Sequence, residues 1–239
     1  MSFRNSVIIV ASPRSRVGKT LLARLIVDFL TQEDRAVAAF DLNSGGDTLA
    51  QFLPGPTAVS AIDGVRDQMA LFDRLIVNDG TAKVVDVGHE WFERFFILAR
   101  QIGFAEEAVM RGIAPAVLFI ITPDATSVEA FHALRRDFPQ IQLVPVHNGV
   151  FGSAQHLGKY RLLGQAASVV ELPALAPGLR RHVETPPFSF ADEGLAAADL
   201  PREIESEVVR WRGRAFREFR ELDLRQLITD LQSSIRLPS

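Results

Sequence analysis

The chain has 239 residues, enough for one large α/β domain with a sizeable core. Its net charge of −3 gives no general electrostatic reason to bind nucleic acid, and the absence of cysteine excludes disulfide bonds and thiolate metal sites. No apolar run is long enough to span a membrane, and no small-residue cleavage site follows the first one. We therefore expect a cytoplasmic protein that does not bind a membrane.

Strand-like and helical patterns alternate along the chain. The first strand is expected over residues 7–11 and the first helix over residues 21–30. Later strands are expected at 36–41, 82–88, 116–123, 141–149 and 168–173, and later helices from about Ser60 with Asp63 as its capping partner, at 91–102, at 127–138 and at about 201–236. This alternation predicts an α/β, three-layer fold: a mostly parallel sheet with helices on both faces. We expect residues 1–239 to form a single domain that ends in the helical segment at about 201–236.

The segment between the first strand and the first helix carries the strongest functional signal. The order strand, loop, Gly18-Lys19-Thr20, helix is that of a phosphate-binding P-loop. Backbone N–H groups converge there, and the helix dipole adds partial positive charge. Lys19 is expected to contact the β- and γ-phosphates, and the Thr20 hydroxyl to bind Mg²⁺. The nucleotide-binding residues expected in this segment are Ser15, Arg16, Val17, Gly18, Lys19, Thr20 and Leu21.

The loop departs from the usual pattern. Pro13 stands where the pattern has a glycine, and it has no N–H to donate. Ser15 and Arg16 adopt positive φ less readily than glycine. Arg14 and Arg16, however, bring two further cations to a site for anions. The alternative without function is a helix that follows a glycine-containing turn, with Lys19 in solvent.

Polar residues also follow the other predicted strands. Asp41, Asp86, Asn148 and Pro173 all fall at carboxyl ends of strands, where parallel sheets bind ligands. Asp86 is expected to hold Mg²⁺ or its water, and Asp41 to contact a metal-bound water. The alternative for each acid is a cap on the next element. Motifs of zinc hydrolases, serine hydrolases and dinucleotide-binding enzymes are absent.

Taken together, these pieces resemble the deviant Walker A ATPases, the ParA/MinD-like family of the SIMIBI class that includes MipZ. The family's loop reads K-G-G-x-G-K-S/T, so Arg14 falls on its signature lysine, which reaches across a nucleotide-sandwich dimer. Asp41 begins the segment that matches the family's D-x-D element, and Asn43 replaces its second acid. Asp86 falls on the acid of the switch II strand, and residues 171–173 resemble the segment that meets the adenine.

The resemblance implies an ATP-binding switch with bound Mg²⁺ and an ATP-dependent homodimer. Its output would be positioning or partitioning of DNA or of a cellular machine, with an unknown partner protein. It implies catalytic roles for Lys19, Arg14, Asp41 and Asn43, metal contacts for Thr20, Asp41 and Asp86, and nucleotide contacts for Asn148 and Pro173. Because an amide at position 43 carries no charge, hydrolysis is expected to be slow or lost. Two alternatives stay open: a dethiobiotin-synthetase-like ligase or small-molecule kinase on the same fold, and a degenerate interaction module.

The C-terminal segment predicts a long amphipathic helix, with apolar residues every three or four positions from Ile204 to Leu222. Between them lie Arg210, Arg212, Arg214, Arg217 and Arg220. The simplest interpretation is a helix docked on the sheet with solvated arginines. A basic face that binds DNA phosphates without sequence choice is the sharper hypothesis, and an interfacial membrane helix is a third.

Overall fold

One parallel sheet organises the described part of the chain, which comprises residues 6–45, 48–152 and 169–235 of a computed structural model. Its strands lie in the order β3-β2-β4-β1-β5-β6-β7, and every pair is parallel. The strands are β1 (Ser6–Ala11), β2 (Val37–Leu42), β3 (Thr57–Val59), β4 (Ala82–Val87), β5 (Ala114–Ile121), β6 (Gln142–Asn148) and β7 (Val170–Leu172).

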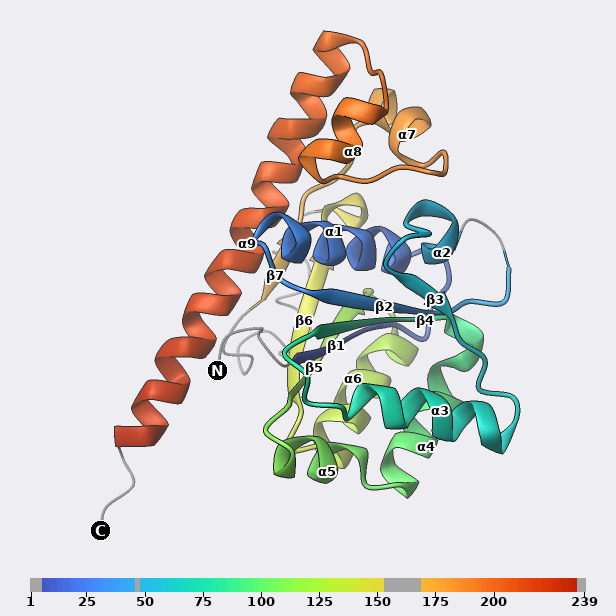
Figure 1. Cartoon of the computed structure of the whole chain (residues 1–239), viewed down its shortest axis with the longest axis vertical. Helices are drawn as coiled ribbons and strands as arrows, with labels where there is room; N and C mark the ends of the chain where they lie inside the picture. Colours follow the sequence, from blue (N-terminus) through green and yellow to red (C-terminus); the bar gives the residue numbers. More distant parts are fainter. Residues whose placement is uncertain (1–5, 46–47, 153–168, 236–239) are drawn as a thin grey trace.

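Helices cover both faces of this sheet (Figure 1). One face carries α1 (Lys19–Gln32), α2 (Leu49–Phe52), α7 (Pro177–Val183), α8 (Asp192–Ala197) and α9 (Arg202–Ile235). The other carries α3 (Val65–Leu75), α4 (Phe92–Gln101), α5 (Phe104–Met110) and α6 (Ala125–Asp137). Successive residues of β1 point to opposite faces, so Ile8 and Val10 enter the first core and Val7 and Ile9 the second. The predicted three-layer α/β fold, a parallel sheet with helices on both faces, is confirmed.

The expected helix start near Ser60 is wrong. Residues 60–64 are not helical, and α3 begins at Val65 after Gly64. The physical reason is that the Ser60 N–H donates to the Asp41 carbonyl at 2.9 Å and so extends the pairing of β3 with β2. The capping box in this region lies earlier, at Thr48 and Gln51 of α2.

α9 lies along the edge of the sheet beside β7 and α1 (Figure 1). Its apolar stripe is buried, and Trp211 donates from Nε1 to the carbonyls of Pro173 and Ala174 at 3.0 and 3.2 Å. No helix among the described residues has the length and apolar character needed to cross a bilayer.

Two buried charged side chains of α1, Arg24 and Asp28, bind the end of α7 and the segment that follows it. The Arg24 guanidinium lies 3.6 Å from the centre of the Phe52 ring and donates to the carbonyls of Val183 and Phe188 at 2.8 and 3.1 Å. One turn later, Asp28 accepts from the Ser189 hydroxyl at 2.9 Å and from the Phe190 backbone N–H. Burial lowers the pKa of Arg24 to about 9 and raises that of Asp28 to about 6.

The raised pKa of Asp28 makes stability depend on pH. The Asp28 carboxyl binds its proton more tightly in the folded protein than in the unfolded chain, where its pKa is near 3.8. Its hydrogen bonds and the charges of Arg24 and Arg212 act to lower the pKa, but burial outweighs them. The resulting stabilisation is complete below about pH 4 and is lost as the pH rises through about 6. Urea unfolding of the wild type and Asp28→Asn between pH 4 and 7 should therefore differ in slope, the wild type losing on the order of 2 kcal/mol more. Parallel profiles would contradict this assignment.

Candidate functional site

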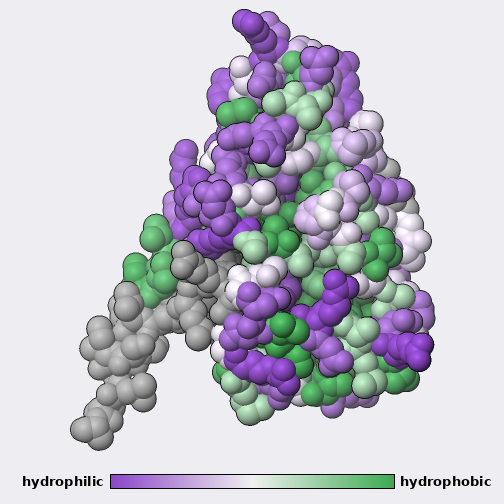
Figure 2. Space-filling view, viewed as in Figure 1, coloured by the Kyte–Doolittle hydropathy of each residue, from purple (hydrophilic) through white to green (hydrophobic). Residues whose placement is uncertain are grey.

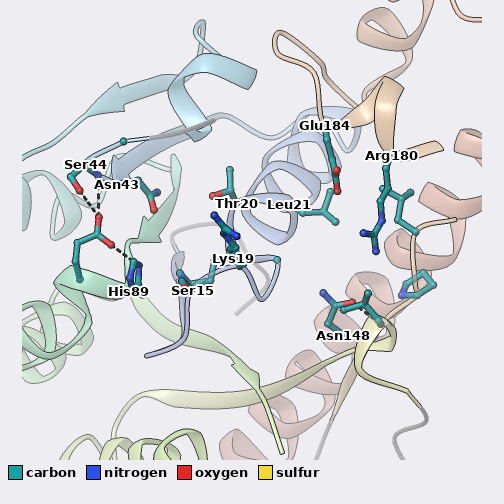
Figure 3. A pocket seen from close by; sticks show the side chains of 17 residues that line it. Ser15, Lys19, Thr20, Leu21, Asn43, Ser44, His89, Asn148, Arg180 and Glu184 are labelled. Atoms are coloured by element: carbon teal, nitrogen blue, oxygen red, sulfur yellow. Dashed lines mark hydrogen bonds and ion pairs between the residues drawn. The ribbon is translucent and has the colours of Figure 1, made fainter. Parts of the chain in front are cut away.

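The loops at the carboxyl ends of the strands surround a cavity of about 870 Å³ (Figure 3). It is lined by residues from five parts of the fold: Ser15, Arg16, Gly18, Lys19, Thr20 and Leu21; Asn43, Ser44 and Gly45; His89 and Glu90; Asn148 and Val150; and Pro173, Leu175, Arg180 and Glu184. Nine of the predicted site residues are in this set. Arg14, Val17, Asp41 and Asp86 are the predicted residues outside it.

The P-loop follows β1 directly and ends at the start of α1. Gly18 has φ +98° and Arg16 has φ +56°, so both lie in the left-handed region. The Asn148 side chain supports the loop from β6, because its Nδ2 donates to the Val17 carbonyl at 2.9 Å. Its Oδ1 accepts from the backbone N–H of Val150 at 3.1 Å. Asn148 therefore holds the loop, and Val17 contributes its backbone.

Lys19 lies over its own loop. The side chain is 7% exposed, and Nζ donates to the Arg14 carbonyl at 2.7 Å. Burial lowers the pKa of Lys19, while the charges of Asp86 and Glu90 act in the opposite direction. This arrangement excludes a lysine extended into solvent and leaves the ammonium at the floor of the cavity.

Asp86 joins three segments at the end of β4. Its Oδ2 accepts from the Thr20 hydroxyl at 2.7 Å and from Asn43 Nδ2 at 2.9 Å. Its Oδ1 is buried and has no hydrogen-bond partner. Burial raises the pKa of Asp86 to about 6, and the charge of Asp41 adds to that effect. A buried carboxylate oxygen without a donor is suited to a proton or to a metal-bound water.

The oxygen atoms of Thr20 and Asp86 are suitable ligands for Mg²⁺. No cluster of three or more metal-binding His, Asp or Glu side chains occurs in the described ranges. Mg²⁺ does not need one, because it retains waters and uses one or two protein ligands with substrate phosphates. Thr20 and Asp86 are adjacent and would supply a hydroxyl and a carboxylate of this kind.

Both carboxylate oxygens of Asp41 already accept hydrogen bonds within the protein. Asp41 is 1% exposed, and its Oδ1 accepts from the backbone and side chain of Asn43 at 3.0 and 2.8 Å. Its Oδ2 accepts from the Ala50 N–H at 2.8 Å. Both oxygens are therefore used to hold the loop after β2. Contact with a metal-bound water stays a prediction.

Arg14 points away from the cavity floor. It forms an ion pair with Asp124, with Nε 3.0 Å from Oδ1. Asp124 is also the N-cap of α6 and accepts from the Ser127 N–H at 3.2 Å. The predicted catalytic role of Arg14 would require this exposed pair to open.

Sequence reasoning did not select several residues that line the cavity. Arg180 of α7 and Glu184, which directly follows α7, lie at the end opposite the loop after β2 (Figure 3). No motif marks that helix. Ser44 and Glu90 come from the loops after β2 and β4. Ser44 follows Asp41 closely in the sequence and Glu90 follows Asp86 closely, and this proximity to acids at strand ends is the signal that identifies them.

We predict that Gly18→Ala strains the loop. A Cβ at this position would lie 2.7 Å from Asn148 Nδ2, and the φ of +98° is unfavourable for alanine. The free energy of unfolding should fall by about 1–3 kcal/mol. Gly213→Ala is the matched control, because nothing lies within 4 Å of its Cβ and α9 is helical there. Urea unfolding should show no loss for the control, and equal effects would argue against a strained loop.

Comparisons with known proteins give similarities of fold. No protein-family model matches the chain, and no curated protein matches it. Among solved structures, the chain is similar to the MinC:MinD cell division protein complex of Aquifex aeolicus, at 16% identity, 87% and 96% coverage of the two chains, and a TM-score of 0.49. It is also similar to the MinD cell division protein of Aquifex aeolicus, at 15% identity, 87% and 97% coverage, and a TM-score of 0.47. At these values neither similarity supports a functional argument.

Proposed function

We propose that this protein is an ATP-binding switch of the ParA/MinD type. ATP and Mg²⁺ would favour a homodimer, and slow hydrolysis would release it. The output would be positioning of DNA or of a cellular machine. The observation that carries the proposal is the contact between the Thr20 hydroxyl and Asp86 at 2.7 Å, with the buried Lys19 ammonium beside it. Together these residues form a site for a metal-bound polyphosphate.

The phosphate end of the cavity is the P-loop. Lys19 would exchange its bond with the Arg14 carbonyl for phosphate oxygens, and the N–H groups at the start of α1 would donate to them. Mg²⁺ would be held by Thr20 and Asp86 and would offset the charge of the phosphates. The unpartnered Oδ1 of Asp86 supports this assignment, because a metal-bound water would give it a donor.

The nucleoside end would lie between the loops after β6 and β7 and α7. Val150, Pro173 and Leu175 offer apolar surface for a base, while Arg180 and Glu184 add one donor and one acceptor. Asn148 has both side-chain groups engaged with backbone, so its role would be to position the loop. Adenine preference rests on the family resemblance.

Arg14 would act only in the dimer. Its ion pair with Asp124 is exposed, with side-chain exposures of 44% and 33%. Exposed pairs of this kind contribute about 0–1 kcal/mol, so a nucleotide phosphate can compete for the guanidinium. Asn43 would hold the loop after β2 against Asp86 while nucleotide binds.

Titration with fluorescent ATP and Mg²⁺ tests nucleotide binding. The wild type should bind, and Lys19→Ala should bind at least about tenfold more weakly because a charge-assisted hydrogen bond is lost. Arg136→Ala removes an exposed cation of α6 outside the cavity and should leave affinity unchanged. Equal binding by the wild type and Lys19→Ala would refute a P-loop site.

The elution volume then tests the switch. A non-hydrolysable ATP analogue should shift the protein to a dimer, whereas ADP should leave it monomeric. A dimer that forms equally with and without nucleotide would favour an interaction module. Turnover that requires a small acceptor would favour the ligase or kinase.

DNA is the second candidate partner, and the structure corrects the predicted basic face. Arg212 is only 7% exposed and donates to the Phe190 carbonyl and to Asp192 at 2.6 and 2.7 Å, so it is not part of a surface. Arg220 pairs with Glu33 at 2.8 Å. The remaining arginines, Arg210, Arg214 and Arg217, line a groove of about 580 Å³ between α9 and residues 174–179.

The surface along α9 changes character toward its C-terminal end. Hydrophilic side chains cover much of the middle of the helix, and hydrophobic surface follows toward its C-terminal end (Figure 2). In this part of α9, Leu224 and Ile228 are 58% and 53% exposed. The three arginines in the groove would meet phosphates without reading sequence, a contact that salt weakens.

Duplex DNA binding at several salt concentrations tests this second candidate. Arg214→Ala or Arg217→Ala should weaken binding for every sequence and reduce the salt slope by about 1 each. Arg220→Ala removes the same charge from the same helix but outside the groove, so its effect should be smaller. Equal effects of all three substitutions would exclude the groove as the DNA-binding surface.

A further inference from the structure

A carboxylate bridges the two loops that flank the phosphate end of the cavity. Glu90 Oε1 accepts from the Ser44 hydroxyl at 2.7 Å and from the Ser44 N–H at 3.2 Å. Glu90 Oε2 lies 2.8 Å from His89 Nδ1. Figure 3 shows these contacts beside Ser44 and His89, across the cavity from Arg180. The loop after β4 is thereby attached to the loop after β2.

Glu90 differs from the other acids on this side of the cavity. Asp41 and Asp86 are 1% and 0% exposed, and neither lines the cavity. Asn43 does line it, but an amide cannot accept a proton from water. Glu90 lines the cavity, and its side chain is 32% exposed, so its carboxylate can reach water there. Among the described residues, Glu184 is the other lining carboxylate, and it directly follows α7.

The charge of Glu90 acts at the phosphate end. Burial lowers the pKa of the Lys19 ammonium, and the charges of Asp86 and Glu90 partly offset this lowering. Burial also acts to raise the pKa of Glu90 itself, but hydrogen bonds, chiefly from the Ser44 hydroxyl, and the charge of His89 outweigh it and lower that pKa. Glu90 is therefore ionised at neutral pH and is an acceptor.

We propose that Glu90 positions the water that attacks the γ-phosphate of ATP, supplying the carboxylate that Asn43 lacks. This inference rests on the proposed function. The water oxygen forms a bond to the γ-phosphorus as the bond from that phosphorus to the bridging oxygen breaks. One water proton passes to the Glu90 carboxylate and then to solvent, and the products are ADP and inorganic phosphate. Ser44 holds the carboxylate in place through two hydrogen bonds.

Glu90→Gln tests this role, because it keeps the shape of the side chain and an oxygen that accepts from Ser44. Affinity for fluorescent ATP should stay within about threefold of wild type, whereas turnover should fall by a factor on the order of 100. Affinity for ADP with aluminium fluoride, a transition-state analogue, should fall by at least about tenfold. The measurement with the analogue needs no turnover.

Two further variants separate this role from a structural one. Glu93→Gln makes the same charge change three residues later, at an exposed position of α4 outside the cavity, and should match wild type in all three measurements. Ser44→Ala keeps the carboxylate and removes one of the two hydrogen bonds that Ser44 donates to it, so turnover should fall by less than in Glu90→Gln.

The outcomes distinguish the two proposals. A wild type that binds no ATP defeats the proposed function itself. A wild type that binds ATP, but hydrolyses it no faster than Glu90→Gln, overturns the role of Glu90 alone. Loss of ATP affinity in Glu90→Gln overturns it as well, because the residue would then serve binding. Retained ATP affinity with reduced turnover and reduced affinity for the analogue supports it.

Discussion

The buried carboxylate of Asp86 is the contact on which the site depends. β4 lies between β1 and β2, so Asp86 is in register with Val10 on one side and Asp41 on the other. Burying a charge is unfavourable unless donors compensate it, and Thr20 and Asn43 provide two donors to one oxygen. The P-loop helix and the loop after β2 are thereby brought to the same point. The second oxygen has no donor, and this leaves one position that a proton or a metal-bound water can satisfy.

α1 connects that point to the opposite end of the cavity. It begins at Lys19, and along its length Arg24 and Asp28 bind the segment that follows α7. Arg180 lies in α7 and Glu184 directly follows it, so the two ends of the cavity are built on one buried, hydrogen-bonded support. Removing either side chain would be destabilising, because the buried backbone groups that it binds would lose a hydrogen-bond partner. The separation between the two ends of the cavity, which the proposed function assigns to phosphate and nucleoside, is therefore held by the core rather than by the loops.

The sequence was sufficient for features that depend on local pattern, and insufficient for those that depend on pairing. Apolar runs predicted β1 and β4, and Gly18-Lys19-Thr20 placed the P-loop between β1 and α1. β3 was not predicted, because its three residues are defined by pairing with β2. The contact between Glu90 and Ser44 arises because β2 and β4 are neighbours, and strand order has no periodic signal. The burial of Arg212, in contrast, could have been predicted from the sequence. Arg212 lies four residues after Val208 and three before Ala215, so the helical period places it beside the apolar stripe.

The unusual P-loop sequence has a local explanation. The glycine that is missing at position 16 leaves Arg16 with φ +56°, a conformation that costs a non-glycine residue about 1 kcal/mol or more. Asn148 supports the same loop through the Val17 carbonyl, and Lys19 does so through the Arg14 carbonyl. Each of these side-chain bonds contributes about as much as the strain costs. In the proposed function, Lys19 would release its bond to the Arg14 carbonyl to bind phosphate, so part of that support would be withdrawn. Asn148 would then be the contact that keeps the loop in place.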